Sequence, residues 1–280
     1  MVSNLECLNF AFDIICLTEV RETSREIIDE VFPEYHIFLD NPTSAKGGVA
    51  LLLRKNKFNN ITELETSTGF NLKGLCNCQQ CKIENKWLRF NINNQSVILG
   101  GIYRHPKGDI QHFSDSLKKV ISNINDDTLA IVLGDININL LVEEDVKTQS
   151  YLNNFLEKSF VPCITLPTRI RNYSATLIDH IFIKCPRKLL QNKVSSGNLI
   201  FDISDHLPNF MFLNINVPST KDRPFIRLYT EKRKKLFIER FFPLFCVEPN
   251  KWSIFRRRNI NIKEHKVGKM IRYIKYQIAR

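Results

Sequence analysis

The sequence contains no long hydrophobic run, and this excludes a protein that crosses a membrane by a helix. Such a helix needs about 20 consecutive apolar residues, and the apolar stretches here are much shorter. The best N-terminal candidate, residues 8–17, contains Asp13 and follows no basic cluster, so it is not a secretory signal peptide. We therefore predict an intracellular protein with no membrane partner.

Two nucleotide-binding signatures and a disulfide framework are also missing. No GxGxxG motif opens a helix after the first predicted strand, and no P-loop is present. Eight cysteines in 280 residues are best interpreted as reduced thiols. Cys76, Cys78 and Cys81 are clustered and have two interpretations, three zinc ligands or a surface loop. The loop is favoured because no fourth ligand stands at a usual spacing.

The chain has an excess of positive charge, and nearly all of it lies at one end. Forty Lys and Arg against 29 Asp and Glu give a formal charge of +11. Residues 221–280 contain eighteen Lys and Arg against five Asp and Glu, whereas residues 1–220 are almost neutral. The shift predicts a body, residues 1–217, and a basic linker or tail, residues 218–280. The tail interleaves basic with aromatic residues, a composition that suits nucleic-acid binding. The preferred alternative is a linker stub without that role.

Short apolar runs alternate with helical patterns along the body. Runs of strand type occupy residues 12–17, 49–53, 87–92, 97–103, 129–133, 177–183 and 208–215, and helical spacing occupies residues 113–124 and about 148–158. Strands outnumber helices, and several strands follow one another as hairpin-like pairs. The pattern predicts an α/β sandwich of two packed, mostly antiparallel sheets with helices on the outside.

Polar residues able to bind a metal or move a proton stand repeatedly beside these strands. Glu19 ends the first run, Asp135 follows the run 129–133, and His206 precedes the last run. Asp179 lies inside an apolar run, where an unpaired carboxylate would cost several kcal/mol. Each residue alone has an ordinary explanation as a strand end or turn. Their joint occurrence in this order predicts one shared site.

The motifs that contain these residues resemble those of the endonuclease/exonuclease/phosphatase superfamily. They read LTE at 17–19, GIYRHP at 101–106, GDIN at 134–137, LIDHI at 177–181 and SDH at 204–206. FDIICLTE at 12–19, GGVA at 47–50 and PTR at 167–169 are most similar to the apurinic-like endonuclease domain of non-LTR (LINE-type) retrotransposon polyproteins. The resemblance covers about residues 5–217. It implies a DNase I-like fold, a four-layered α/β sandwich of two packed mixed β-sheets flanked by helices.

The resemblance also implies a metal site and a water-activating group. Glu19 would anchor a hard cation such as Mg²⁺, with Mn²⁺ as an alternative, because such ions take oxygen ligands. Asp205 would contribute to the metal shell. Asp135 would accept the proton of the attacking water, and Asn137 would orient the water or the phosphate.

The remaining implied roles concern the phosphate. Asp179 would hold the ring of His206, whose other nitrogen would meet a phosphate oxygen. Tyr103 would donate its hydroxyl to the same phosphate, or else it is an aromatic residue packed at a sheet edge. The residues implied as further phosphate or DNA contacts are Arg104, Thr168 and Ser204.

The resemblance implies a metal-dependent DNA endonuclease that nicks one strand, as target-site nicking in a retroelement requires. DNA is then the partner and the nucleus the location. We expect a monomer, and the sequence indicates no protein partner. Two alternatives stay open. One is a catalytically inactive nucleic-acid-binding remnant of a retroelement, and the other is a phosphatase or phospholipid phosphodiesterase of the same superfamily.

The chain departs from the family at its start. Members begin with an earlier strand whose asparagine helps to set the metal and the catalytic aspartate, whereas residues 1–8 here have a helix-like pattern. We therefore expect that this first strand is missing, as in a truncated element copy. The expected consequence is an exposed sheet edge and a thinner metal shell.

Overall fold

The computed structural model describes residues 11–21, 25–40, 47–58, 60–72, 83–93, 95–142, 144–171, 173–186, 189, 194–200, 204–215 and 270–277. By its contacts the chain divides into one unit of Met1–Val217 with Lys269–Arg280 and a second unit of Pro218–Gly268. The clustered cysteines at 76, 78 and 81 and tail residues 218–269 fall outside the described residues. The zinc and linker hypotheses for them therefore stay predictions.

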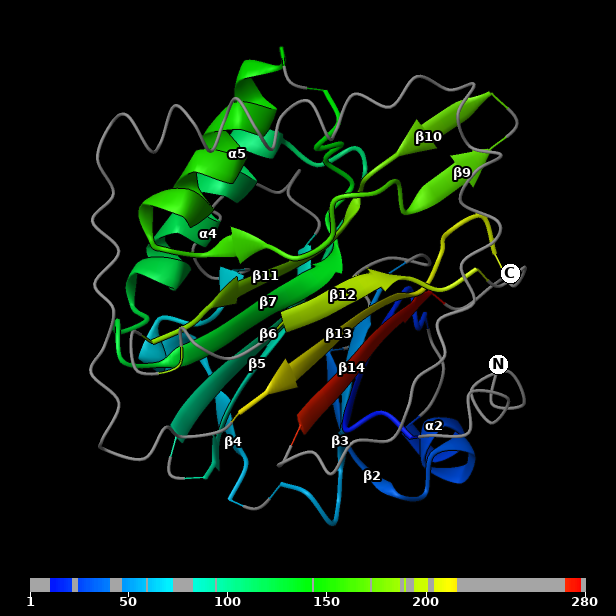
Figure 1. Cartoon of the computed structure of the whole chain (residues 1–280), viewed down its shortest axis with the longest axis vertical. Helices are drawn as coiled ribbons and strands as arrows, with labels where there is room; N and C mark the ends of the chain where they lie inside the picture. Colours follow the sequence, from blue (N-terminus) through cyan, green and yellow to red (C-terminus); the bar gives the residue numbers. More distant parts are fainter. Residues whose placement is uncertain are drawn as a thin grey trace. The chain divides into compact units, whose positions relative to one another are not determined.

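Two six-stranded sheets form the centre of the first unit (Figure 1). The first contains, in sheet order, β12 (Val194–Asn198), β13 (Asn209–Asn214), β14 (Met270–Gln277), β1 (Ile14–Thr18), β3 (Val49–Arg54) and β2 (Tyr35–Asp40). The second contains β4 (Thr62–Leu64), β5 (Ile83–Ile92), β6 (Gln95–Arg104), β7 (Leu129–Asp135), β11 (Asp179–Lys184) and β8 (Val161–Pro162). A separate hairpin consists of β9 (Arg169–Arg171) and β10 (Ser174–Thr176).

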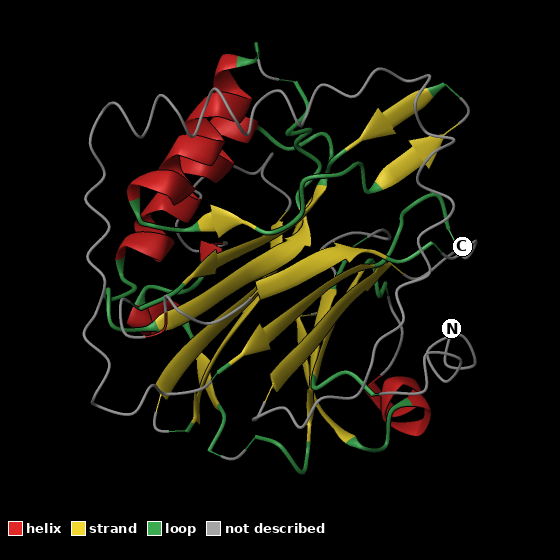
Figure 2. Cartoon of the chain, in the orientation of Figure 1, coloured by secondary structure: helices red, strands yellow, loops and turns green. Residues whose placement is uncertain are grey.

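Helices cover the outer faces of both sheets, as Figure 2 shows. They are α2 (Arg25–Val31), α4 (Ile110–Ser122) and α5 (Val146–Glu157), and a 3-10 turn covers Thr66–Thr68. One buried cluster joins the facing sides of the two sheets, a second joins the second sheet to α4 and α5, and a third joins the first sheet to α2. The four-layered α/β sandwich is therefore confirmed. No helix in the described ranges is long and apolar enough to cross a membrane.

Local sequence explains the elements that carry the site. Every residue of β7 is buried, as expected of a continuous apolar run in the middle of a sheet. The α4 helix buries Phe113, Leu117 and Val120, which lie on one face by helical periodicity. The carboxylate of Asp109 caps this helix by accepting the His112 amide hydrogen at 2.8 Å.

The sequence predicted an exposed sheet edge where the family's first strand is missing. In the structure β14 lies beside β1, so this edge of β1 is covered. β14 pairs in parallel with β1 through five register pairs and antiparallel with β13 through six. Residues 270–277 therefore belong to the sheet, although the sequence predicted them as part of the tail. They include Ile271, Tyr273, Ile274 and Tyr276, and β-branched and aromatic residues of this kind are enriched in strands. The prediction missed it because the positive charge of the tail dominated the interpretation.

Candidate functional site

Three of the predicted site residues lie in one row across the second sheet. Tyr103 on β6 is the register partner of Asp135 on β7, which is in turn the partner of Asp179 on β11. Direct partners on neighbouring strands project from the same face. Alternate residues before Asp135, such as Leu133, belong to the core between the sheets. The row therefore continues this inner face.

A glycine is required immediately before Asp135. Gly134 has φ +149°, and a Cβ built there would lie 1.7 Å from the carbonyl oxygen of Ile102. Every other residue would clash with the backbone of β6 at this point. The GD pair of the sequence motif thus allows β6 and β7 to approach closely where both deliver a site residue.

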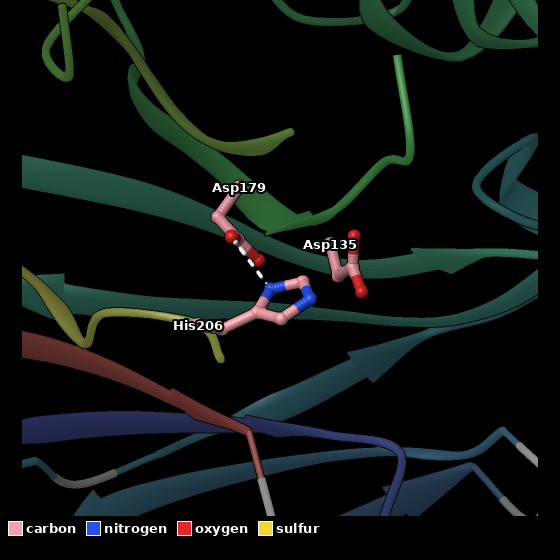
Figure 3. Close-up of side chains that lie close together, drawn as sticks. All are labelled: Asp135, Asp179 and His206. Atoms are coloured by element: carbon pink, nitrogen blue, oxygen red, sulfur yellow. Dashed lines mark hydrogen bonds and ion pairs between the residues drawn. The ribbon is translucent and has the colours of Figure 1, made fainter. Parts of the chain in front are cut away.

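Asp179 and His206 form a buried pair. The two side chains are 1% and 6% exposed, and Oδ2 of Asp179 lies 2.8 Å from Nδ1 of His206. One ligand atom from each of Asp135, Asp179 and His206 lies within 4.8 Å of the others, and Figure 3 shows the imidazole between the two carboxylates. When Nδ1–H donates to Asp179, the ring's other nitrogen is an acceptor. Burial lowers the pKa of His206 below 6.5, against the charge of Asp135.

Glu19 brings the first sheet into the site. It follows β1 in a left-handed conformation, φ +55°, and Oε1 accepts the Tyr103 hydroxyl at 3.1 Å. Burial first, and then the charges of Glu19 and Asp135, raise the pKa of Tyr103 above its ordinary value of 10.0. The hydroxyl therefore keeps its proton and is a hydrogen-bond donor.

Asn137 and Arg104 lock the backbone that follows Asp135. Asn137 has φ +53°, its amide N–H donates to Oδ1 of Asp135 at 3.3 Å, and its side chain donates to the Arg104 carbonyl at 2.8 Å. The guanidinium of Arg104 donates to the carbonyls of Ile136 at 2.7 Å, Asn137 at 2.8 Å and Gly108 at 2.6 Å. Arg104 is only 1% exposed. Arg104 was predicted to contact a phosphate or DNA. In the structure it is buried, and its guanidinium binds backbone carbonyls instead.

Thr168 and Ser204 also serve the backbone of the site in this structure. The Thr168 hydroxyl accepts the amide hydrogens of Ile178 at 3.2 Å and Asp179 at 3.0 Å, and the residue is fully buried. The Ser204 hydroxyl accepts the amide hydrogen of His206 at 3.1 Å and donates to its carbonyl at 3.0 Å. These hydroxyls support the two members of the Asp179–His206 pair, and their contact with a phosphate or DNA stays a prediction.

Among the described residues, Asp205 lies outside the cluster of Asp135, Asp179 and His206, whose ligand atoms are within 4.8 Å of one another. Its Oδ2 accepts hydrogen bonds from Nε of Arg169 at 2.7 Å and Nε of Arg171 at 2.6 Å. Burial acts in the opposite direction, but these arginines lower the pKa of Asp205 to about 2. The predicted metal ligand is therefore engaged in ion pairs, because β9 brings two arginines to it.

Glu84 is a buried carboxylate that the sequence analysis did not select. It is 1% exposed and is the register partner of Tyr103 on β5. A Cβ built at Gly47 would lie 3.0 Å from its Oε1, so the glycine leaves space for this carboxylate. The row thereby spans four strands. No periodicity marks Glu84 in the sequence, because only the pairing of β5 with β6 places it beside Tyr103.

His180, the neighbour of Asp179, points to the opposite face of the sheet. Its Nδ1 lies 3.0 Å from the Tyr151 hydroxyl of α5, and its Nε2 lies 3.0 Å from the Ile138 carbonyl. The hydroxyl donates to the first nitrogen and the second nitrogen donates to the carbonyl, which is the neutral form. Burial lowers the pKa of His180 from 6.5 to about 4.

The His180 environment predicts an acid-sensitive fold. Between pH 6.5 and 4 the unfolded chain binds a proton at this residue and the folded chain does not, so the free energy of unfolding falls as the pH falls, by up to about 1.4 kcal/mol per pH unit. In urea titrations from pH 7 to 4, His180→Phe should gain about 3 kcal/mol relative to the wild-type protein. The exposed His36 provides the control. His36→Phe should follow the wild-type curve, and parallel curves for His180→Phe would contradict the prediction.

Comparison with known proteins gives a fold but no close relative. No family model matches the sequence, and no curated protein matches it. Similar solved structures include an endonuclease/exonuclease/phosphatase protein from Bacteroides vulgatus, 17% identical, covering 77% of this chain and 88% of that chain with a TM-score of 0.54. A mannosyl-6-phosphatase from Bacteroides thetaiotaomicron is 14% identical, covers 76% and 89%, and has a TM-score of 0.54.

A third similar structure is TDP2 from D. rerio, complexed with a single-strand DNA product. It is 14% identical, covers 73% of this chain and 86% of that chain, and has a TM-score of 0.52. This chain has the endonuclease/exonuclease/phosphatase fold. At these identities the likeness is one of fold. Within the endonuclease/exonuclease/phosphatase fold, the described chain brings together acidic groups and a histidine that can bind a divalent cation.

Proposed function

We propose that this protein is a metal-dependent phosphodiesterase, acting as a DNA endonuclease that nicks one strand at the target site of a LINE-type retroelement. The observation that carries the proposal is the buried pair of Asp179 and His206, 2.8 Å apart, with Asp135 beside the ring. An imidazole oriented by one carboxylate and close to a second one is an arrangement for moving protons at a reacting phosphate.

The donor set fits a hard divalent cation. Nδ1 of His206 and Oδ2 of Asp179 bind each other, so the carboxylates of Glu19 and Asp135 are the groups to hold the ion. Both act electrostatically on Tyr103. Such oxygen ligands suit Mg²⁺ or Mn²⁺. When bound, the cation supplies neutralisation of the phosphoryl oxygens and acidifies water.

The protein's own side chains divide the remaining work. Asp135 accepts a proton from the attacking water, and its position is held by the amide of Asn137. Asp179 holds Nδ1–H of His206, which leaves the other ring nitrogen for a phosphate oxygen. The protonated hydroxyl of Tyr103 donates to the same phosphate and so stabilises the charge that develops there.

DNA as the substrate is supported from two sides. The motifs at 12–19, 47–50 and 167–169 resemble LINE-type endonuclease domains, and TDP2, which shares the fold, is complexed with a single-strand DNA product. We accordingly propose DNA as partner, a nuclear location and a monomeric protein. The mannosyl-6-phosphatase with the same fold favours a phosphatase as the second candidate.

The proposal is tested by incubating the protein with supercoiled plasmid and Mg²⁺. We expect open circles that chelation of the metal prevents, and little release of phosphate from phosphomonoesters. Glu19→Ala should raise the Mg²⁺ concentration needed for half-maximal nicking at least tenfold, because it removes one of the two oxygen ligands. The exposed Glu30 of α2 provides the matched control, Glu30→Ala. Phosphomonoester hydrolysis without nicking would select the phosphatase, and salt-dependent DNA binding without hydrolysis would select the inactive remnant.

A further inference from the structure

Two arginines of the β9–β10 hairpin bind the residue next to the active-site histidine. Nε of Arg169 and Nε of Arg171 lie 2.7 and 2.6 Å from the same oxygen, Oδ2 of Asp205. The two arginines are two residues apart on a strand, so their side chains leave the same face of β9. This spacing allows both to reach one carboxylate.

Backbone hydrogen bonds join the same two segments. The amide of Ile170 donates to the Asp205 carbonyl at 3.1 Å, and the amide of Leu207 donates to the Thr168 carbonyl at 2.7 Å. His206 forms an antiparallel bridge with Arg169. The segment that carries His206 is therefore attached to β9 on both sides of the histidine.

The residue that precedes β9 contacts the other member of the pair. The Thr168 hydroxyl accepts the amide hydrogen of Asp179 at 3.0 Å, and the amide of Thr168 donates to the Thr176 carbonyl at 2.8 Å. Residues 168–171 thus hold Asp179 through one hydroxyl and His206 through Asp205 and the backbone. This segment therefore contacts both residues whose side chains form the 2.8 Å hydrogen bond between Asp179 and His206.

We propose that Asp205, Arg169 and Arg171 form an ion-pair latch that sets His206 against Asp179, and that Asp205 is a positioning residue and not a metal ligand. The inference rests on the proposed function for its effect on rate. A displacement of about 1 Å in a catalytic group can cost up to 10²-fold in rate. The latch gives the hairpin control over the catalytic histidine.

The test compares Asp205→Asn with the double variant Arg169→Gln/Arg171→Gln and with the triple variant. Asp29→Asn on α2 is the control, because Asp29 forms an exposed ion pair with Arg25 that lies away from the hairpin. In the plasmid assay each latch variant should lower kcat about tenfold, with KM and the half-maximal Mg²⁺ concentration unchanged. The triple variant should be no slower than either, because all three side chains act as one unit.

A second readout does not depend on activity. Amide hydrogen exchange at Ile170 and Leu207 should become at least tenfold faster in the latch variants and stay unchanged in Asp29→Asn. If the wild-type protein does not nick DNA but exchange accelerates as stated, the proposed function fails and the latch stands. A tenfold rise in the half-maximal Mg²⁺ concentration for Asp205→Asn alone would make Asp205 a metal ligand and overturn the latch. Unchanged exchange in all variants would also overturn it.

Discussion

Replacing Asp135 with asparagine is expected to lower the rate of plasmid nicking about 10²–10⁴-fold, the range typical for loss of a general base. The substitution keeps the size of the side chain and an oxygen that can still accept the Asn137 amide hydrogen. It removes the negative charge that accepts a proton and holds the cation. The buried position of Asp135 makes this charge hard to replace by water.

The measurement is single-turnover nicking at saturating Mg²⁺, with circular dichroism as a check on folding. Asp115 on α4 is exposed and provides the matched control, so Asp115→Asn should nick at the wild-type rate. A folded Asp135→Asn protein with a rate within threefold of wild type would show that another group accepts the proton. The buried Glu84 in the same row would then be the next residue to substitute.

Deleting residues 269–280 is expected to unfold the first sheet and abolish nicking. β14 is the strand that connects β13 to β1, through six and five register pairs respectively. Each backbone hydrogen bond contributes about 0.5–1.5 kcal/mol net, and a whole domain is stable by only about 5–15 kcal/mol. The lost pairing is therefore comparable with the total stability.

The deletion also separates the two halves of the site. Glu19 follows β1, and His206 precedes β13, so both residues are carried by strands that β14 holds together. Urea unfolding measures the effect, and a chain that ends after Gln277 is the control, because it keeps the complete strand. A synthetic peptide of residues 269–280 should restore part of the folding. An unchanged urea midpoint for the deleted chain would disprove this role of β14.

Sequence patterns were sufficient for the layers that carry the site. Continuous apolar runs predicted β6, β7 and β13, and helical spacing predicted α4 and α5, because a buried strand or an amphipathic helix leaves a local pattern. β14 escaped prediction because both of its partners are distant in the chain: β1 precedes it by more than 250 residues, and β13 is separated from it by the strongly basic segment. A local pattern contains no information about which strands will pair.

The candidate site divides in the same way. The sequence predicted that three residues would meet in one site, because they stand beside core strands and belong to motifs in a known order. These residues are Asp135, Asp179 and His206. Only the folded chain shows the contacts of three other residues. Arg104 binds backbone carbonyls, Thr168 accepts backbone amide hydrogens, and Asp205 pairs with arginines. The reason is physical. Hydrophobic patterning along the chain determines which elements are buried, whereas a hydrogen bond or an ion pair forms only where tertiary packing places a partner within about 3 Å.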